Sequence, residues 1–274
     1  MSVVDPSRPA ASTSVSPALR CEGLTKAFQG VHAVNGAAFS IPEGQITALI
    51  GPNGAGKTTV VNMLSGAMKS DSGRMFIGET ETTGWPSHKV ARHGLLRTFQ
   101  LSRELGGLTV LENLLTAAPN QAGDSLVNVL LRPGLIERQE RENAERALQL
   151  LEVYGLYRHR DTPARELSGG QKKLLEIARA VMGSPRILLL DEPMAGVNPA
   201  LIDVLGGYIR DLKKDGVTIL MVEHNLGVVE QICDHVIVLA EGRTLATGRL
   251  ADLRQNTEVV KAYLGEVMDA SSAD

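Results

Sequence analysis

The stretch Gly51-Pro52-Asn53-Gly54-Ala55-Gly56-Lys57-Thr58 has the spacing G-x-x-x-x-G-K-T. In such a loop the glycines let backbone N–H groups approach phosphate oxygens, the lysine adds a fixed positive charge, and the threonine hydroxyl is a hard ligand for Mg²⁺. The flanks suit this interpretation, because Gln45 to Ile50 predicts a buried strand and Thr59 to Met68 predicts a helix. A phosphate would then lie at a helix N-terminus. We therefore interpret the stretch as a triphosphate-binding loop rather than a chance match.

An acidic pair follows a second predicted strand. Asp191 ends the aliphatic run Ile187 to Leu190, and Glu192 comes next. The carboxyl ends of parallel strands meet at one edge of a sheet, so Asp191 is expected beside the phosphate loop, as a partner for Mg²⁺. Glu192 is expected to orient and deprotonate a water in front of the terminal phosphate. The alternative is an ordinary acidic pair at a strand exit.

Two further polar residues have weaker support. His224 follows the apolar run Val217 to Val222 and is expected at the same edge, where it could hold the outermost phosphate and the attacking water. An isolated histidine is more often structural or solvent-facing. Gln100, after Leu96-Arg97-Thr98-Phe99, lies at a junction where an amide can equally cap a turn.

Ser168-Gly169-Gly170-Gln171 opens a predicted helix. Ser168 is a good N-cap, and capping is the simplest account of it. Two adjacent glycines weaken a first turn unless something approaches the backbone closely, and an anion at a helix N-terminus would do so. Because the chain already has a phosphate loop, this second element is expected to complete a site on another copy or on a paralogue.

Length and composition limit the remaining possibilities. The chain has 274 residues, 43% of them hydrophobic, and a formal net charge of −3 with interspersed signs. Without a basic stripe, nucleic acid is not an expected partner. Cys21 and Cys233 are far apart and lack metal-ligand spacing, which favours a reducing compartment and a role as buried filler. No apolar run approaches the about 18 to 20 residues that cross a bilayer.

The pattern along the chain predicts one domain with an insertion. Residues 1–18 are interpreted as a disordered tail, 19–268 as the domain, and 269–274 as a frayed end. Before about residue 97, Ala37 to Pro42 and Gly73 to Ile77 predict an antiparallel edge leading into a parallel core. A mostly helical insertion is expected over about 101–183, where Ala147, Leu148 and Leu151 share a helical face. Strands resume at Arg186 to Leu190, Thr218 to Val222 and Val236 to Leu239, which is typical of a doubly wound α/β sheet.

Together these motifs, in this order, resemble the ATP-binding cassette (ABC) family from about Leu19 to Gly265. The resemblance implies an α/β P-loop NTPase (RecA-like) core with an antiparallel β subdomain, an inserted α-helical subdomain, and the cofactors ATP and Mg²⁺. It implies catalytic roles for Glu192, His224 and Gln100, and metal ligation by Thr58, Gln100 and Asp191. It also implies nucleotide contacts from Thr59 and from Phe28 against adenine. In the implied head-to-tail dimer, Ser168, Gly169, Gly170 and Gln171 of one subunit face the nucleotide of the other.

Within the family, Arg97-Thr98-Phe99-Gln100, the run Leu108 to Leu114 and the ending Ala262 to Glu266 resemble the LivG-type ATPases of branched-chain amino-acid importers. The chain departs from that subgroup at Gly169, where an aromatic residue is common, and from the family at Asn198, where Asp is commoner. The resemblance implies a peripheral protein at the cytoplasmic face of the membrane, with permease subunits, a second ATPase subunit and a solute-binding protein as partners. Two alternatives remain open: an export ATPase of the lipopolysaccharide, lipid or drug type, and a soluble non-transport ABC protein.

Overall fold

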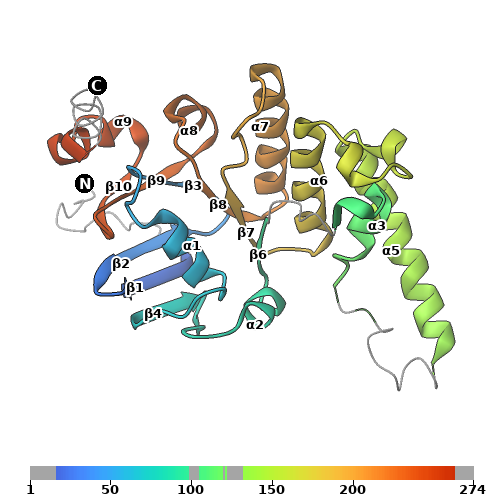
Figure 1. Ribbon diagram of the computed structural model, residues 1–274, viewed down its shortest axis with the longest axis horizontal. Helices are drawn as coiled ribbons and strands as arrows, with labels where there is room; N and C mark the ends of the chain where they lie inside the picture. The colour runs from blue at the N-terminus through green and yellow to red at the C-terminus, as the bar shows by residue number, and fades with distance from the viewer. Residues whose placement is uncertain (1–16, 99–104, 120, 122–131, 263–274) are drawn as a thin grey trace, which may run out of the picture.

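Figure 1 shows the chain as a computed structural model, which describes residues 17–98, 105–119, 121 and 132–262. Gln100 and both expected terminal tails, apart from residues 17 and 18, lie outside the described residues. The expected boundaries of the tails and of the insertion stay predictions.

A 6-stranded sheet forms the centre of the molecule, in the order β10-β9-β3-β8-β7-β6. All neighbours from β9 to β6 pair in parallel, whereas β10 is antiparallel to β9. The parallel strands are nearly uniform aliphatic runs because both faces of the sheet are covered. The strands are β3 (Ile46–Ile50), β6 (Leu95–Arg97), β7 (Ile187–Asp191), β8 (Thr218–Val222), β9 (His235–Ala240) and β10 (Arg243–Gly248).

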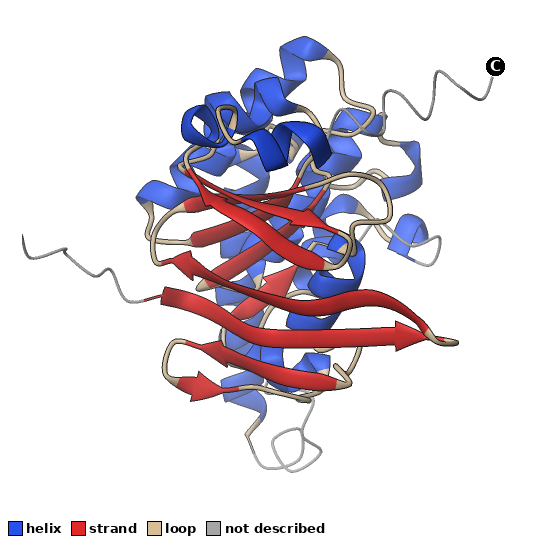
Figure 2. Cartoon of the chain, turned by 90° about the vertical axis from the view of Figure 1, so that its left-hand side faces the viewer, coloured by secondary structure: helices blue, strands red, loops and turns tan. Residues whose placement is uncertain are grey.

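The expected antiparallel strands form a separate 4-stranded sheet, in the order β2-β1-β4-β5. This confirms the antiparallel subdomain that the resemblance implied, and it differs from the edge of the parallel sheet that the local pattern predicted. The antiparallel edge of the central sheet is β10, from near the end of the chain. The two sheets meet where the amide of Asn35 donates to the carbonyl of Gly242 at 2.8 Å. Figure 2 shows the strands of both sheets one above the other, with helices above and behind them. The second sheet contains β1 (Pro17–Phe28), β2 (Val31–Pro42), β4 (Ser72–Ile77) and β5 (Thr80–Glu81).

Side chains that alternate between the two faces of the central sheet contribute to two separate hydrophobic cores. In β3, Ile46, Ala48 and Ile50 face one core, and Leu49 faces the other. The first core is shared with α6 (Gly169–Met182), α7 (Pro199–Lys214) and α8 (Leu226–Ile232). The second is shared with α1 (Lys57–Leu64) and the antiparallel sheet. Helix α1 and helix α6 therefore pack on opposite faces of the central sheet.

The region between β6 and β7 is helical where it is described, as expected, and lies at the right of Figure 1. In α5, Ala147 and Leu151 are buried and Leu148 is half-buried, which matches the predicted face. None of the described helices is both long and apolar enough to cross a membrane. The remaining helices are α2 (Ser87–Arg92), α3 (Val110–Leu115), α5 (Pro133–Val153), α9 (Leu250–Leu253) and the 3-10 turns Leu105–Gly107, Tyr157–His159 and Ala164–Glu166.

Candidate functional site

The predicted triphosphate-binding loop, Gly51 to Thr58, follows β3 and leads into α1, as the sequence predicts. Helix α1 begins at Lys57 and ends at Leu64, so it starts and stops earlier than the expected span from Thr59 to Met68. Its N-cap is Gly56, in the left-handed region, and no side chain caps the first turn. The amides of that turn are therefore not occupied by a capping side chain, which is the arrangement that favours an anion.

Within the loop, a side chain would be disfavoured at Gly56 and at Gly54 for different reasons. A Cβ on Gly56 would lie 2.4 Å from the carbonyl oxygen of Ala33, so close packing disfavours a side chain there in addition to the left-handed backbone. Gly54, at φ 77°, has no atom within 4 Å of the corresponding position, and its conformation rather than its neighbours favours glycine. Lys57 Nζ donates to the carbonyl oxygens of Gly51 at 2.7 Å and Pro52 at 2.8 Å, so the ammonium lies over the loop.

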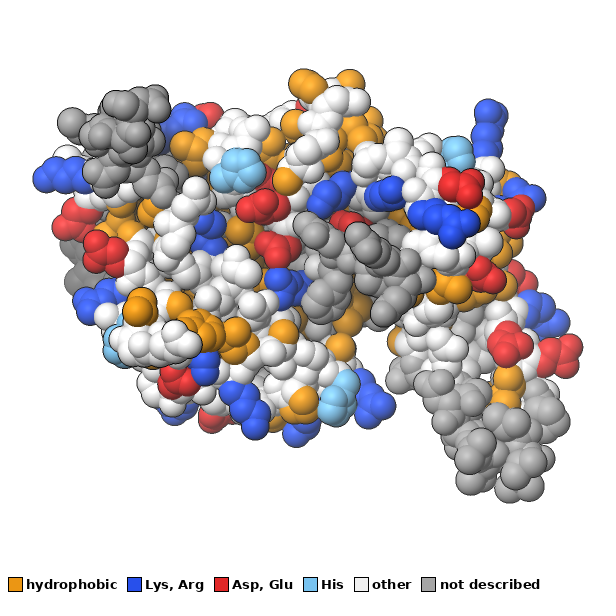
Figure 3. Space-filling view, in the orientation of Figure 1, with side chains coloured by type: hydrophobic (Ala, Val, Ile, Leu, Met, Phe, Trp, Pro, Cys, Tyr) orange, Lys and Arg blue, Asp and Glu red, His pale blue; other side chains and the backbone are white. Residues whose placement is uncertain are grey.

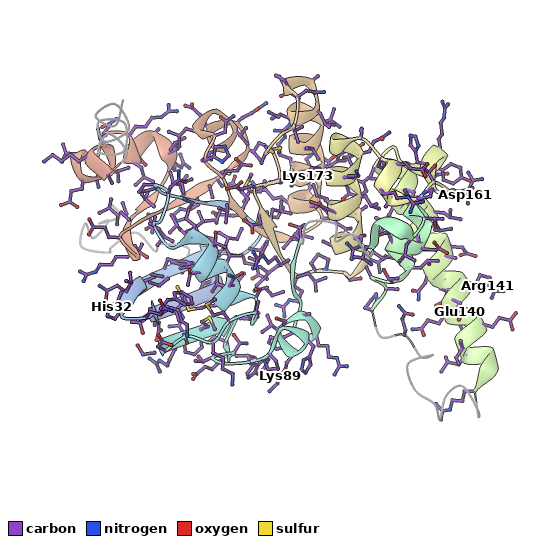
Figure 4. All side chains as sticks on the ribbon, in the orientation of Figure 1. His32, Lys89, Glu140, Arg141, Asp161 and Lys173 are labelled. Atoms are coloured by element: carbon purple, nitrogen blue, oxygen red, sulfur yellow. The ribbon has the colours of Figure 1, made fainter. Side chains whose placement is uncertain are left out.

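Glu192 lies one residue beyond β7 in a left-handed conformation, at φ 46°. Its amide donates to the carbonyl of Val222 at 3.1 Å, and its own carbonyl accepts from the amide of Ala195 at 3.1 Å. Lys173, labelled in Figure 4, reaches from α6 to within 3.5 Å of the same carbonyl. These contacts hold the backbone of Glu192 while its side chain stays about half exposed, with 49% of its surface accessible.

His224 follows β8 after one intervening residue and comes close to Glu192. The distance from His224 Nδ1 to Glu192 Oε1 is 3.9 Å, and the histidine side chain is 66% exposed. In the space-filling view, acidic, basic and histidine side chains lie next to one another near β7 and β8 (Figure 3). A carboxylate and an imidazole in this position could act together on one water molecule.

Asp191 has a partner that the sequence did not suggest for it. Arg97 Nη2 donates to Asp191 Oδ2 at 2.7 Å, and Arg97 Nη1 donates to Asn62 Oδ1 at 2.5 Å. The Thr98 hydroxyl accepts from the amide of Asp191 at 3.4 Å. The only available signal was the position of Arg97 at the end of a short apolar run, which does not identify a partner.

Glu223 is a second residue that the sequence did not single out. Only 1% of its surface is exposed, and its Oε1 accepts from the amide of Met194 at 3.1 Å. Burial raises the pKa of this carboxyl, and hydrogen bonds from neighbouring amides oppose that shift only in part. Glu223 is the residue before His224, and this hydrogen bond thus ties the end of β8 to the loop that follows Glu192.

The start of α6 is capped as expected. Ser168 Oγ accepts from the amide of Gln171 at 3.3 Å, and Gln171 Oε1 accepts from the amide of Ser168 at 2.9 Å. A Cβ on Gly170 would lie 2.0 Å from the terminal methyl Leu201 Cδ2, so a larger residue here requires the Leu201 side chain on α7 to move. Gly169 has open space around it, and packing does not account for it.

Phe28 ends β1 beside a tight hairpin and is 44% exposed. Lys26 Nζ lies 5.9 Å from its ring centroid. An aromatic ring this accessible is not part of either core, and it is free to stack on a planar ligand.

Comparison with known proteins gives one consistent result. Residues 34–195 match a family model described as ABC transporter. The chain is 42% identical over 247 residues to a probable branched-chain amino acid transport ATP-binding protein LivG of Archaeoglobus fulgidus, covering 90% of this chain and 95% of the relative. It is 42% identical over 251 residues to the high-affinity branched-chain amino acid transport ATP-binding protein BraF of Pseudomonas aeruginosa, covering 91% and 98%.

Solved structures agree. A nucleotide-free ATP-binding cassette from an ABC transporter superposes with a TM-score of 0.80 at 37% identity, covering 90% of this chain and 98% of that one. An ATP-binding cassette of an ABC transporter in its ADP conformation gives a TM-score of 0.78 at 36% identity, covering 91% and 99%.

Proposed function

Because this chain belongs to the ABC transporter family and is an ATP-hydrolysing subunit of that family, we propose that it powers a membrane importer of branched-chain amino acids. The observation that carries the proposal is the similarity to LivG and BraF across nine-tenths of the chain, together with the approach of Glu192 and His224. The same relatives favour import over the export alternative.

In this proposal the loop Gly51 to Thr58, followed by Thr59, holds the phosphates of ATP. Backbone amides at the uncapped start of α1 donate to phosphate oxygens, and Lys57 adds positive charge. Phe28 stacks on adenine from its exposed position at the end of β1. Glu192 accepts a proton from the attacking water, and His224 donates to the terminal phosphate, so that water and phosphate are held in line.

The residues present also fit a magnesium ion. Thr58 and Asp191 offer hard oxygen atoms, and among the described residues no group of three or more His, Cys, Asp or Glu side chains forms a dedicated metal cage. Magnesium is commonly held by one or two protein oxygens together with water and substrate phosphates, where it neutralises phosphate charge. Gln100, which lies outside the described residues, completes the proposed ligand set.

The proposed assembly places two ATPase subunits head to tail, with Ser168, Gly169, Gly170 and Gln171 of each turned toward the nucleotide held by the other. The second subunit is an identical copy or a paralogue. The pair binds permease subunits at the cytoplasmic face of the membrane, and ATP-driven closure moves the solute that a binding protein delivers. No nucleic acid takes part.

Reconstitution tests this proposal. The chain is purified with the permease subunits and binding protein encoded beside it and placed in lipid vesicles. We expect ATP hydrolysis to rise when the binding protein carries leucine, isoleucine or valine, and to stay at its basal rate with the unloaded binding protein. Stimulation by a lipid or drug in the absence of any binding protein would instead support the export alternative.

A further inference from the structure

Arg97 connects two elements that carry proposed magnesium ligands. It is the last residue of the edge strand β6, and its side chain is only 10% exposed. One end of its guanidinium holds Asn62 on α1, and the other holds Asp191 at the end of β7. The bridge therefore ties the phosphate-loop helix to the strand of the acidic pair.

Asn62 lies on α1 one turn from Thr58, and this position links the bridge to a proposed magnesium ligand. Thr58 and Asn62 are four residues apart in one helix, so they lie on the same face, one turn from each other. A contact that fixes Asn62 against Arg97 also fixes Thr58. The same guanidinium fixes one oxygen of Asp191, which sets the direction of the other.

We propose that Arg97 is a positioning residue that sets the spacing and orientation of Thr58 and Asp191, and so sets the affinity for the Mg²⁺ ion that accompanies ATP. This rests on the proposed function. A planar guanidinium with donors at fixed angles suits the task, because it can hold two acceptors at once in a defined geometry.

The charge of Arg97 acts in the opposite direction. A cation beside a carboxylate that ligates a metal repels the metal, so any gain in Mg²⁺ affinity from Arg97 has to be geometric. Arg97→Lys separates the two effects, because lysine keeps the charge but presents it as a point on a flexible stem. Asn62→Ala removes the other end of the bridge and leaves the charge unchanged.

The experiment measures binding of a fluorescent ATP analogue by the full chain, first in chelator and then along a Mg²⁺ titration. Loss of a group that orients a metal ligand typically lowers metal affinity by about 10- to 100-fold. We expect the Mg²⁺ concentration at half-maximal enhancement to rise about tenfold in Arg97→Lys and by a smaller factor in Asn62→Ala. Nucleotide binding in chelator should remain as in the wild type for both.

Arg138→Lys is the matched control, because Arg138 makes an exposed ion pair with Glu142 at 2.8 Å on α5. It should titrate as the wild type does. Thermal unfolding identifies variants that fail to fold, and if Arg97→Lys is one of them, Asn62→Ala decides the matter. An unchanged or lowered Mg²⁺ midpoint in the folded variants overturns the role of Arg97. Failure of the wild type to bind the analogue under any condition would contradict the proposed function instead.

Discussion

Glu192 Oε1 and His224 Nδ1 lie 3.9 Å apart, although 32 positions (224 − 192) separate the two residues in the chain. The sheet explains their approach. Strands β7 and β8 are parallel neighbours, and Asp191 is in register with Val222. The residues that follow both strands therefore emerge at one edge, where the phosphate loop after β3 also begins.

Glu192→Gln should leave nucleotide binding intact and nearly abolish turnover. The amide cannot accept a proton from water, and general-base catalysis is typically worth about 10² to 10⁴ in rate. Steady-state phosphate release and equilibrium binding of ATP measure the two effects separately. Undiminished phosphate release by this variant would remove Glu192 from the role of base.

His224→Ala should also slow hydrolysis, because the phosphate and the water lose one positioning donor. His88→Ala is its control, since His88 is an exposed histidine on α2. Both variants should bind ATP as the wild type does. Equal turnover of the two histidine variants would show that His224 has no part in the reaction.

The two glycines that open α6 should respond differently to alanine. Gly169→Ala enters open space and should keep or slightly raise the free energy of unfolding, by up to about 1 kcal/mol. Gly170→Ala places a methyl group against Leu201, and overpacking of this kind costs about 1–3 kcal/mol. The lower end is expected, because the obstructing atom is a terminal methyl that can rotate.

Urea unfolding of both glycine variants, of Leu201→Ala and of the double variant Gly170→Ala/Leu201→Ala tests this packing explanation. Removing the Leu201 side chain should relieve part of the cost of Gly170→Ala, as a double-mutant cycle would show. If Gly170→Ala is as stable as the wild type, the packing explanation fails. Loss of ATPase activity in a fully stable Gly169→Ala would show that its open first turn serves a ligand.

Glu223 should make a contribution to the free energy of unfolding that depends on pH. Burial raises the pKa of its carboxyl in the folded chain above the ordinary value of 4.5. At pH values between 4.5 and the raised pKa, the folded protein binds more protons than the unfolded chain. The free energy of unfolding therefore falls as the pH rises through that range. Glu223→Gln cannot titrate, and it keeps an acceptor for Met194.

Urea unfolding of wild type and Glu223→Gln over a pH series that starts near 4.5 isolates this component. The wild-type value minus that of the variant should be greatest at the acidic end and smaller above the raised pKa. Asp71, whose pKa is lowered by Lys26, titrates in both proteins and cancels in the difference. A difference that does not vary with pH would show that Glu223 titrates normally.

Both cysteines should be nearly inert in the folded chain. Burial raises the pKa of Cys21 and of Cys233 to about 12. The thiolate is the reactive form, so only about one thiol in 10⁴ would be reactive at pH 8. A thiol-specific reagent should label both residues slowly in buffer and fully in denaturant. Rapid labelling of native Cys21→Ser would place the accessible thiol at Cys233.

The sequence predicted the parallel core well because its strands are short aliphatic runs with clear ends, as in β7 and β8. For the antiparallel strands, the pattern along the chain predicted an edge of the parallel sheet, whereas the family resemblance implied the separate antiparallel subdomain that the structure contains. Local patterns do not show which sheet a strand joins, and the pairing of β10 with β9 depends on contacts distant in sequence. The expected end of α1 at Met68 missed the turn at Gly66, which has φ 69°.

For the site, the sequence predicted roles for residues whose spacing suggests chemistry, such as Lys57 and Glu192, and these roles stay predictions. It missed those whose importance depends on a partner in space. Arg97 is of interest because it donates hydrogen bonds to Asn62 and Asp191. Glu223 is of interest because it accepts a hydrogen bond from Met194 in the loop after β7. The packing of α6 against α7 likewise depends on residues distant in sequence, and it places Leu201 where a Cβ on Gly170 would lie.

The left-handed backbone of Glu192 implies that folding stability and the proposed catalytic role favour different residues at this position. For a side chain with a Cβ, such a conformation costs about 1–2 kcal/mol, whereas glycine adopts it freely. Selection for heat resistance alone, without any demand for hydrolysis, should therefore enrich glycine at position 192. In the proposed mechanism hydrolysis needs the carboxylate of Glu192, so the protein would keep activity at the expense of some stability.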